Sequence, residues 1–235
     1  MMEEKKPEQK DTSATAQRKK AASAHPQKIR IGITGSMGSG KSTAGKIISR
    51  YIPFNDCDRI NSDLLQPGHR GWKALEKAGL LIADDKGGLD RKAIADRMFT
   101  DPKHRKKIEG ILQPMILEEM EAWLDGQDGL CAVEVPLLFE CSLQDRFDQV
   151  WTVLCPYEKA LERLELGRHI PPEQAKARLA VQYSPQKKAE LSSAILYNDD
   201  TLENLENQIR ILLEKNGLDL DRLPALANKP GSLPE

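Results

Sequence analysis

The sequence has no apolar run long enough to cross a membrane and no excess of charge of one sign. A transmembrane helix needs roughly 20 consecutive apolar residues, and no stretch of the 235 residues approaches that length. The 35 Lys and Arg residues are balanced by 36 Asp and Glu residues, whereas a dedicated nucleic-acid-binding protein is usually strongly basic. We therefore expect neither a membrane helix nor a nucleic-acid partner.

Cysteine motifs are missing as well. No two cysteines are spaced as C-x-x-C, and no histidine lies at zinc-finger spacing from them. The four cysteines are Cys57, Cys131, Cys141 and Cys155. Three of them lie in or beside apolar runs, where a free cysteine behaves as a small core residue, so we expect a reducing, cytoplasmic compartment. Cys57 lies between Asp56 and Asp58, whose charges should raise its pKa, and we do not expect it to be a nucleophile.

Both ends of the chain have the composition of tails. Residues 1–27 have almost no apolar bulk and are predicted to be disordered. They lack the apolar segment of a signal peptide, and their acidic residues are atypical of a mitochondrial transit peptide. Residues 216–235 contain Pro and Gly and are predicted to form a C-terminal tail.

A glycine-rich segment carries the strongest functional signal. Residues 35–42 match the phosphate-loop pattern G-x-x-x-x-G-K-[ST]. A β-branched run at 28–33 predicts a strand before it, and apolar residues at helical spacing over 43–51 predict a helix after it. In this order, the loop amides and the helix N-terminus point toward an anion. The predicted phosphate-binding residues of this segment are Gly35, Ser36, Met37, Gly38, Ser39, Gly40, Lys41, Ser42 and Thr43.

Each polar residue of the segment has a distinct predicted role. Lys41 should bridge the β- and γ-phosphates, and the Ser42 hydroxyl is the expected ligand of Mg²⁺. Thr43 should contact a phosphate nearer the base. Gly38 and Gly40 are needed because a Cβ would prevent positive φ and a close phosphate approach.

The rest of the chain predicts an α/β fold of the three-layer P-loop kinase type, with a parallel five-stranded sheet. The second strand ends near Asp56 and Asp58, and we expect it to lie beside the first strand. Residues 68–128 break the strand–helix alternation and predict an inserted helical substrate lobe, interrupted at Pro102 and Pro114. Residues 158–191 are helical, basic and hinged, which is typical of a lid over a nucleotide. The predicted core comprises residues 28–67, 129–157 and 192–215.

Phosphoryl transfer also needs a group for the acceptor hydroxyl and a cation for the developing charge. Asp58 or Asp56 could accept the proton of an acceptor hydroxyl, although an Asp at a strand end also caps helices well. Arg163 or Arg168 of the predicted lid could offset the charge. Glu134, at the end of the third predicted strand, could support a metal ion, but the residues leave this open.

Several further segments resemble the dephospho-coenzyme A kinase family, in family order, over roughly residues 28–213. The Asp-x-Asp and Pro-Leu-Leu-Phe-Glu segments are together more selective than the phosphate loop alone. The matching segments after the phosphate loop are 56–58, 66–68, 89–91, 98–99, 135–140, 178–182 and 195–198. The chain departs from the usual family pattern at Ser62 and Gln113, where basic residues are common, and at Gly167, where Arg is common.

The resemblance implies ATP as donor, with Mg²⁺, and the ribose 3′-hydroxyl of dephospho-coenzyme A as acceptor. It implies that Asp58 positions or deprotonates this hydroxyl, and that residues 68–128 form the coenzyme A lobe. It also implies a role for Asn198 in binding ATP, and we expect a monomer or weak oligomer. The lobe-side candidates for contacting the acceptor are Asp56, Arg91, Arg105 and Gln113.

Two other functions remain open from the residues. One is a nucleotide or nucleoside kinase of the same architecture. The other is a regulatory ATPase that acts through a partner, although the chain lacks a guanine-reading Asn-Lys-x-Asp segment and has a lobe where a switch loop would lie.

Overall fold

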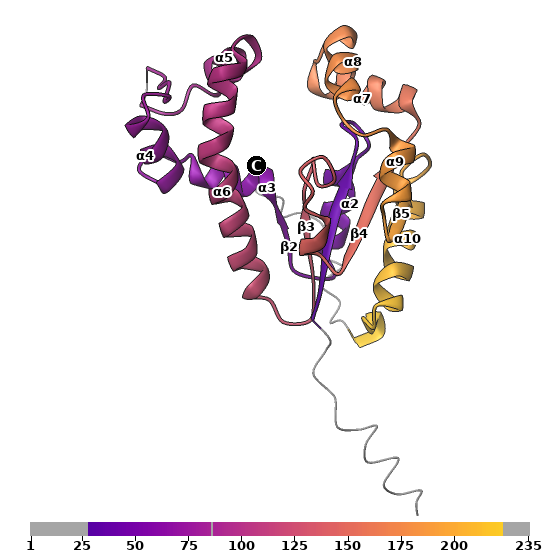
Figure 1. The fold of residues 1–235 in the computed structure, drawn as a ribbon. Helices are drawn as coiled ribbons and strands as arrows, with labels where there is room; N and C mark the ends of the chain where they lie inside the picture. The colour runs from indigo at the N-terminus through magenta and orange to yellow at the C-terminus, as the bar shows by residue number, and fades with distance from the viewer. Residues whose placement is uncertain (1–27, 86, 223–235) are drawn as a thin grey trace, which may run out of the picture.

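The computed structural model describes residues 28–85 and 87–222 (Figure 1). The tail predicted for residues 1–27 lies outside the described residues, as do residues 223–235 of the predicted C-terminal tail. The described residues 216–222 include a short 3₁₀ helix, η2 (Leu220–Arg222), and Leu218 packs against the core.

A five-stranded parallel sheet forms the centre of the molecule, as predicted, and its strand order is β2-β3-β1-β4-β5. The strands are β1 (Ile29–Gly35), β2 (Phe54–Asp56), β3 (Leu130–Glu134), β4 (Gln149–Leu154) and β5 (Ala194–Tyr197). The expectation that the second strand lies beside the first is wrong, because β3 pairs with both β1 and β2 and separates them. The reason is that a long crossover through the inserted helices returns the chain between the first two strands.

Helices cover both faces of this sheet and give the three predicted layers (Figure 1). Successive side chains of a strand point to opposite faces, so Ile29, Ile31 and Ile33 of β1 all contribute to one core cluster. That cluster contains side chains of α2 (Lys41–Ile48) and α10 (Leu202–Lys215). The opposite cluster contains side chains of α3 (Cys57–Leu64) and α6 (Pro102–Asp125).

The inserted segment has its own small core. The helices α4 (Arg70–Lys77) and α5 (Arg91–Thr100) pack against the outer half of α6. The buried side chains of this core are Leu65, Leu75, Leu80, Ile94, Ile108 and Leu112. The predicted break at Pro102 is found, because Pro102 opens α6 and Asp101 caps it through the backbone N–H groups of Lys103 and His104.

The predicted interruption at Pro114 is wrong, because α6 continues through it. A proline in a helix leaves the carbonyl four residues earlier without its hydrogen-bond donor. Here Pro114 and Gly110 are both exposed, so water can reach that carbonyl. The apolar face of α6 is meanwhile held by packing against α3, α4 and α5, which outweighs the local cost.

A second helical segment connects β4 to β5. It contains α7 (Tyr157–Arg168), α8 (Pro172–Ala180) and α9 (Pro185–Glu190). Gly167 lies inside α7, which ends at His169 in the left-handed conformation (φ 51°). Figure 1 shows the α4–α6 and α7–α8 segments on opposite sides beyond the carboxyl ends of the strands. In the described part of the chain, no helix is both long enough and apolar enough to span a membrane.

The packing of α10 on the sheet gives a direct test of this layer. Leu213 is fully buried, whereas Ile211 on the same helix is 51% exposed. We expect Leu213→Ala to lower the free energy of unfolding by about 2–5 kcal/mol, since it leaves a cavity against the sheet. Ile211→Ala, the matched control, should change it by less than about 0.5 kcal/mol. Urea denaturation of both variants measures the difference, and equal losses would contradict this packing.

Candidate functional site

The phosphate loop connects the end of β1 to the start of α2. Gly38 (φ 80°) and Gly40 (φ 94°) adopt left-handed backbone conformations that side chains with a Cβ rarely take. Gly40 is the N-cap of α2 and offers no side chain to the first amides of that helix. These amides therefore remain available to an anionic ligand, as the sequence predicts.

Close packing is a second reason for the glycines. A Cβ on Gly35 would lie 2.4 Å from the carbonyl oxygen of Val153, and one on Gly38 would lie 2.6 Å from that of Ala160. A Cβ on Gly40 would lie 1.9 Å from Nδ2 of Asn198. The loop is therefore enclosed by β4, α7 and the segment after β5.

Two side chains from distant parts of the chain hold the loop in place. Nδ2 of Asn198 donates a hydrogen bond to the Ser39 carbonyl (2.9 Å), and Nη1 of Arg163 donates to the same oxygen (3.4 Å). Nη2 of Arg163 also donates to the carbonyl oxygen of Asn198 (3.3 Å). Asn198 thus contacts the loop's backbone, and Arg163 is the predicted lid arginine whose guanidinium reaches the loop.

The loop and α7 border a small cavity of about 140 Å³. Its lining residues are Gly38, Gly40, Lys41, Ser42, Thr43, Arg163 and Leu164. Nζ of Lys41 donates to the Ser36 carbonyl (3.2 Å), while Ser36 and Ser39 are buried and Met37 is half-buried. Two cationic side chains and the helix N-terminus therefore meet in one cavity, which suits a polyphosphate. Arg168 ends α7, but its side chain lies outside the described part of the structure.

The acidic pair lies where β2 ends and α3 begins, at the same edge of the sheet. Asp56 is the N-cap of α3, and its carboxylate accepts hydrogen bonds from the backbone amides of Asp58 (2.6 Å) and Arg59 (3.4 Å). This cap explains why the helix begins at Cys57. Asp58 lies in the first turn of α3 with an exposed side chain. Of the two acids, Asp58 is therefore the better placed to meet a ligand.

Cys57 lies between these acids and packs toward Met120. Burial, followed by the charges of Asp56, Asp58 and Glu134, raises the pKa of the Cys57 thiol to about 12. The thiol is therefore protonated at neutral pH, which supports the prediction that it is not a nucleophile. The sequence predicts the contribution of the carboxylates, and the structure adds burial as the larger cause.

The residues predicted to contact the acceptor from the inserted lobe do not all line the same cavity. Arg91 and Gln113 line one cavity of about 280 Å³ between α3, α5 and α6, and Nη1 of Arg91 donates to the Ser62 hydroxyl (3.2 Å). Arg105 does not line this cavity in the described residues, and its Nε pairs with Glu109 (2.8 Å).

Two site residues were given no role from the sequence. Asn61 lines the same lobe cavity, and its Oδ1 is buried without a hydrogen-bond partner among the described residues. Gln182, between α8 and α9, accepts a hydrogen bond from the backbone N–H of Met37 in the phosphate loop (3.0 Å). Asn61 follows Asp58 by three residues, so helical spacing could have placed both on one face.

The fit of Gly40 against Asn198 predicts a strong effect of a single methyl group. Gly40→Ala combines an unfavourable φ with the clash at Nδ2 of Asn198, so we expect ATP affinity to fall by at least about 100-fold. Gly110→Ala is the control, because that helical glycine has nothing within 4 Å of an added Cβ. Isothermal titration with ATP measures both variants. Unchanged affinity in Gly40→Ala would contradict the proposed loop geometry.

The family described as dephospho-CoA kinase matches residues 29–204 of this chain. A relative of that name from Frankia casuarinae is 34% identical over 183 residues, covering 76% of this chain and 80% of the relative. Another from Thiobacillus denitrificans is 33% identical over 199 residues, covering 83% and 98%.

Two solved structures are similar to this chain in fold. A crystal structure of a Thermus thermophilus protein is 30% identical, with a TM-score of 0.67 and coverage of 81% of this chain and 98% of that one. A dephospho-CoA kinase from Campylobacter jejuni shares the fold at 22% identity, with a TM-score of 0.54 and coverage of 80% and 96%. The phosphate loop, the acidic pair after β2 and these matches show that the chain belongs to the dephospho-coenzyme A kinase family.

Proposed function

We propose that the protein transfers the γ-phosphoryl group of ATP to the ribose 3′-hydroxyl of dephospho-coenzyme A, giving coenzyme A. The observation that carries this proposal is the family match, which spans the phosphate loop, Asp58 and the inserted lobe. The geometry supports it, because two helix N-termini with different chemistry lie at one edge of the sheet. That of α2 is open to phosphate, and that of α3 presents Asp58.

On the donor side, Lys41 and the amides of the phosphate loop hold the phosphates of ATP. Thr43 contacts a phosphate nearer the base, and Asn198 fixes the loop from behind. Arg163 borders the cavity, and its proposed role is to offset the charge that develops in the transition state. Such an arginine can be worth roughly 10³–10⁵ in rate. Arg168 is a second candidate for this role.

The residues present suit Mg²⁺, which takes oxygen ligands and keeps several waters. The Ser42 hydroxyl is exposed and lines the phosphate cavity. Glu134 is a buried oxygen donor at the carboxyl end of β3, paired in register with Ile33 and Asp56. When bound, Mg²⁺ would neutralise charge on the phosphate oxygens. Ser42 is the proposed direct ligand, with Glu134 as a supporting acid.

On the acceptor side, the exposed carboxylate of Asp58 accepts a hydrogen bond from the ribose 3′-hydroxyl and orients its oxygen toward the γ-phosphate. It takes the proton as the new P–O bond forms and the bond from the γ-phosphorus to the β,γ-bridging oxygen breaks, which releases ADP. A positioned carboxylate base typically contributes about 10²–10⁴ in rate. Asp56 supports this geometry by capping α3, so its role on the substrate side is indirect.

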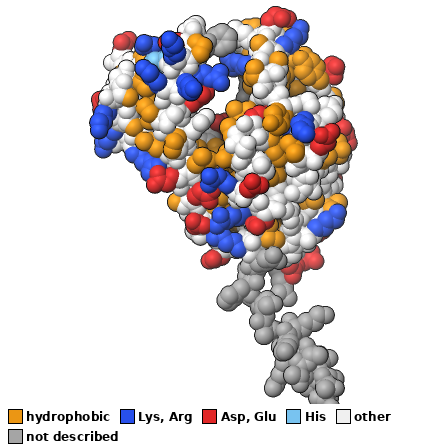
Figure 2. All heavy atoms as spheres, viewed as in Figure 1, with side chains coloured by type: hydrophobic (Ala, Val, Ile, Leu, Met, Phe, Trp, Pro, Cys, Tyr) orange, Lys and Arg blue, Asp and Glu red, His pale blue; other side chains and the backbone are white. Residues whose placement is uncertain are grey.

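The two helical segments then have the roles of substrate lobe (68–128) and lid (158–191). Figure 2 shows the surface hollowed between them, with Lys and Arg side chains gathered on the α4–α6 side of the hollow. Arg91 and Gln113 are the proposed contacts of that lobe with the anionic acceptor, and Arg105 is a peripheral one. The four free cysteines are in keeping with a reducing cytoplasm, and we propose a monomer or weak oligomer.

The lobe cavity suits the base of the acceptor. The base is attached to the same ribose as the 3′-hydroxyl, so it must lie near Asp58. Asn61 follows Asp58 by three residues, which is about one helical turn, and is therefore near enough to contact the base. Apolar side chains such as Ile94 and Leu112 line the cavity, and these suit the faces of a purine. The buried Oδ1 of Asn61 would accept a hydrogen bond from the exocyclic amine.

The role of Asp58 predicts a selective defect. We expect Asp58→Asn to lose at least about 100-fold in kcat while keeping its affinity for ATP, because the proton acceptor is lost and the donor site is untouched. Asp63→Asn on the same helix is the control. A coupled ADP-release assay with dephospho-coenzyme A measures turnover, and a wild-type rate in Asp58→Asn would contradict the role.

The same assay on the wild-type protein tests the two alternative functions. A preference for a nucleotide acceptor would favour a nucleotide kinase, and ATP hydrolysis without transfer to any acceptor would favour a regulatory ATPase.

The role of Asn61 predicts a loss of base discrimination. The wild-type protein should use dephospho-coenzyme A about 10-fold or more better, in kcat/KM, than an analogue whose base is unsubstituted purine, since the analogue leaves Oδ1 unpaired. In Asn61→Leu the two acceptors should become equivalent within about 2-fold. Steady-state kinetics on the four combinations measures this. Discrimination that persists in Asn61→Leu would place the base elsewhere.

A further inference from the structure

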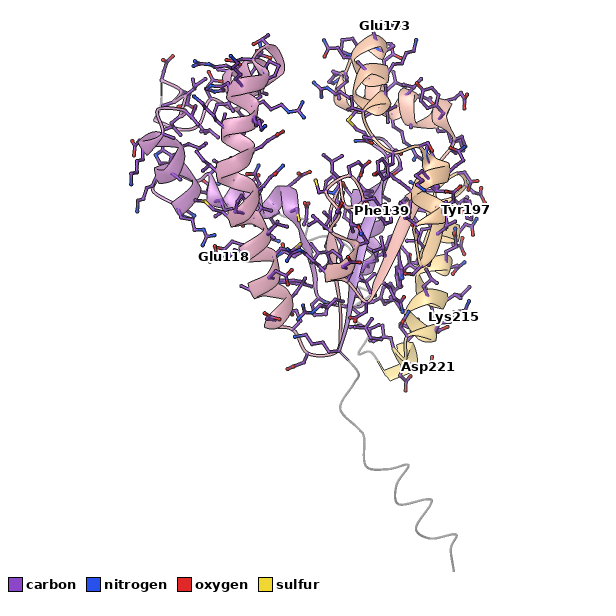
Figure 3. The ribbon with its side chains drawn as sticks, viewed as in Figure 1. Glu118, Phe139, Glu173, Tyr197, Lys215 and Asp221 are labelled. Carbon is purple, nitrogen blue, oxygen red and sulfur yellow. The ribbon has the colours of Figure 1, made fainter. Side chains whose placement is uncertain are left out.

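A buried ion pair joins the turn after β3 to α9. Lys188 on α9 is fully buried, and its Nζ lies 2.8 Å from Oε1 and 3.1 Å from Oε2 of Glu140. The Glu140 side chain is itself 13% exposed. Figure 3 labels Phe139, the residue before Glu140, near the centre of the molecule between the two helical segments. A buried ammonium group is costly unless it is paired, so the position of Glu140 is closely constrained.

Glu140 has a second partner in the chain that returns from α8. Its Oε1 accepts a hydrogen bond from the backbone N–H of Tyr183 (2.8 Å). The preceding residue, Gln182, accepts one from Met37 of the phosphate loop. Two consecutive residues of the returning chain are therefore fixed, one to the phosphate loop and the other to Glu140.

Beyond this point the chain is tied to the sheet. The Ser192 hydroxyl bonds to the Lys188 carbonyl and lies 2.5 Å from the hydroxyl of Thr152 in β4. The amide of Ser193 donates to the carbonyl of Val150 (2.8 Å). On the other side of Tyr183, α8 is mostly exposed, and Ala175 is its buried residue. Tyr183 thus marks the boundary between an exposed helix, α8, and a segment that is tied to the sheet.

We propose that Glu140 is a positioning residue that anchors the returning end of the lid at Tyr183, and that Lys188 holds its carboxylate in place. The proposal rests on the lid role given above for residues 158–191. With this end fixed, α8 and the C-terminal part of α7 move about Tyr183 over one path, and the hydrogen bond from Met37 to Gln182 belongs to the closed arrangement. Loss of the anchor leaves the fold intact but lets the closed arrangement open more often.

A pair of double variants separates this role from a contribution to stability alone. E140M/K188M removes the ion pair and the acceptor for the Tyr183 amide, whereas E140Q/K188M removes the ion pair but keeps a side-chain oxygen at position 140. Neither leaves an unpaired buried charge, and such replacements are often neutral for stability. The two variants should therefore unfold at similar urea concentrations.

The kinetic readout is expected to differ between them. E140M/K188M should lose about 10-fold or more in kcat/KM for ATP and release more ADP without an acceptor, because the lid closes less often and admits water. E140Q/K188M should recover most of this loss. Equal kinetics in two variants of equal stability would overturn the proposal.

A second readout does not depend on the acceptor. Hydrogen exchange of peptides covering residues 172–183, measured with and without ATP, should be at least about 10-fold faster in E140M/K188M than in E140Q/K188M. If the wild-type protein failed to phosphorylate dephospho-coenzyme A and the two variants still showed this difference, the proposed acceptor would be wrong and the anchor would stand. Equal exchange rates would reject the anchor, whatever the acceptor is.

Discussion

The conformation of the phosphate loop is the constraint on which the rest of the structure depends. Its two left-handed glycines cannot hold the loop by themselves, since glycine has more conformational freedom to lose than any other residue. The restraint comes from outside, where Asn198 and Arg163 both donate to the Ser39 carbonyl and Gln182 accepts from Met37. The segment after β5, the helix α7 and the link between α8 and α9 are thus joined at one loop.

Two helix N-termini at the same edge of the sheet show how local chemistry divides the site. Helix α2 begins at a glycine and leaves its first amides to a ligand, while α3 begins at Asp56, whose side chain already satisfies two amides. An anion is therefore attracted to α2 and not to α3. Asp58 lies exposed in the first turn of α3, which is in keeping with its proposed role toward a neutral hydroxyl.

Acidic and basic side chains in the interior lie where two parts of the fold must be held in a fixed position relative to each other. Glu134 lies between β1 and β2, and the Glu140–Lys188 pair joins the turn after β3 to α9. Buried charges add little net stability, but their partners are costly to separate. They therefore suit positions where geometry matters more than stability.

Local patterns in the sequence determined the phosphate loop, the order of strands and helices, and the parallel three-layer sheet, because glycine spacing and hydrophobic periodicity act over a few residues. The sequence also singled out Asp58, although its family role came from resemblance. Tertiary structure decided that β3 separates β2 from β1 and that packing carries α6 through Pro114. It also decided that Arg163 reaches the loop and that Glu140 pairs with the buried Lys188. The buried Oδ1 of Asn61, which has no hydrogen-bond partner among the described residues, is likewise a result of tertiary packing. These features depend on residues far apart in the chain, whose meeting is set by the global packing and not by any local pattern.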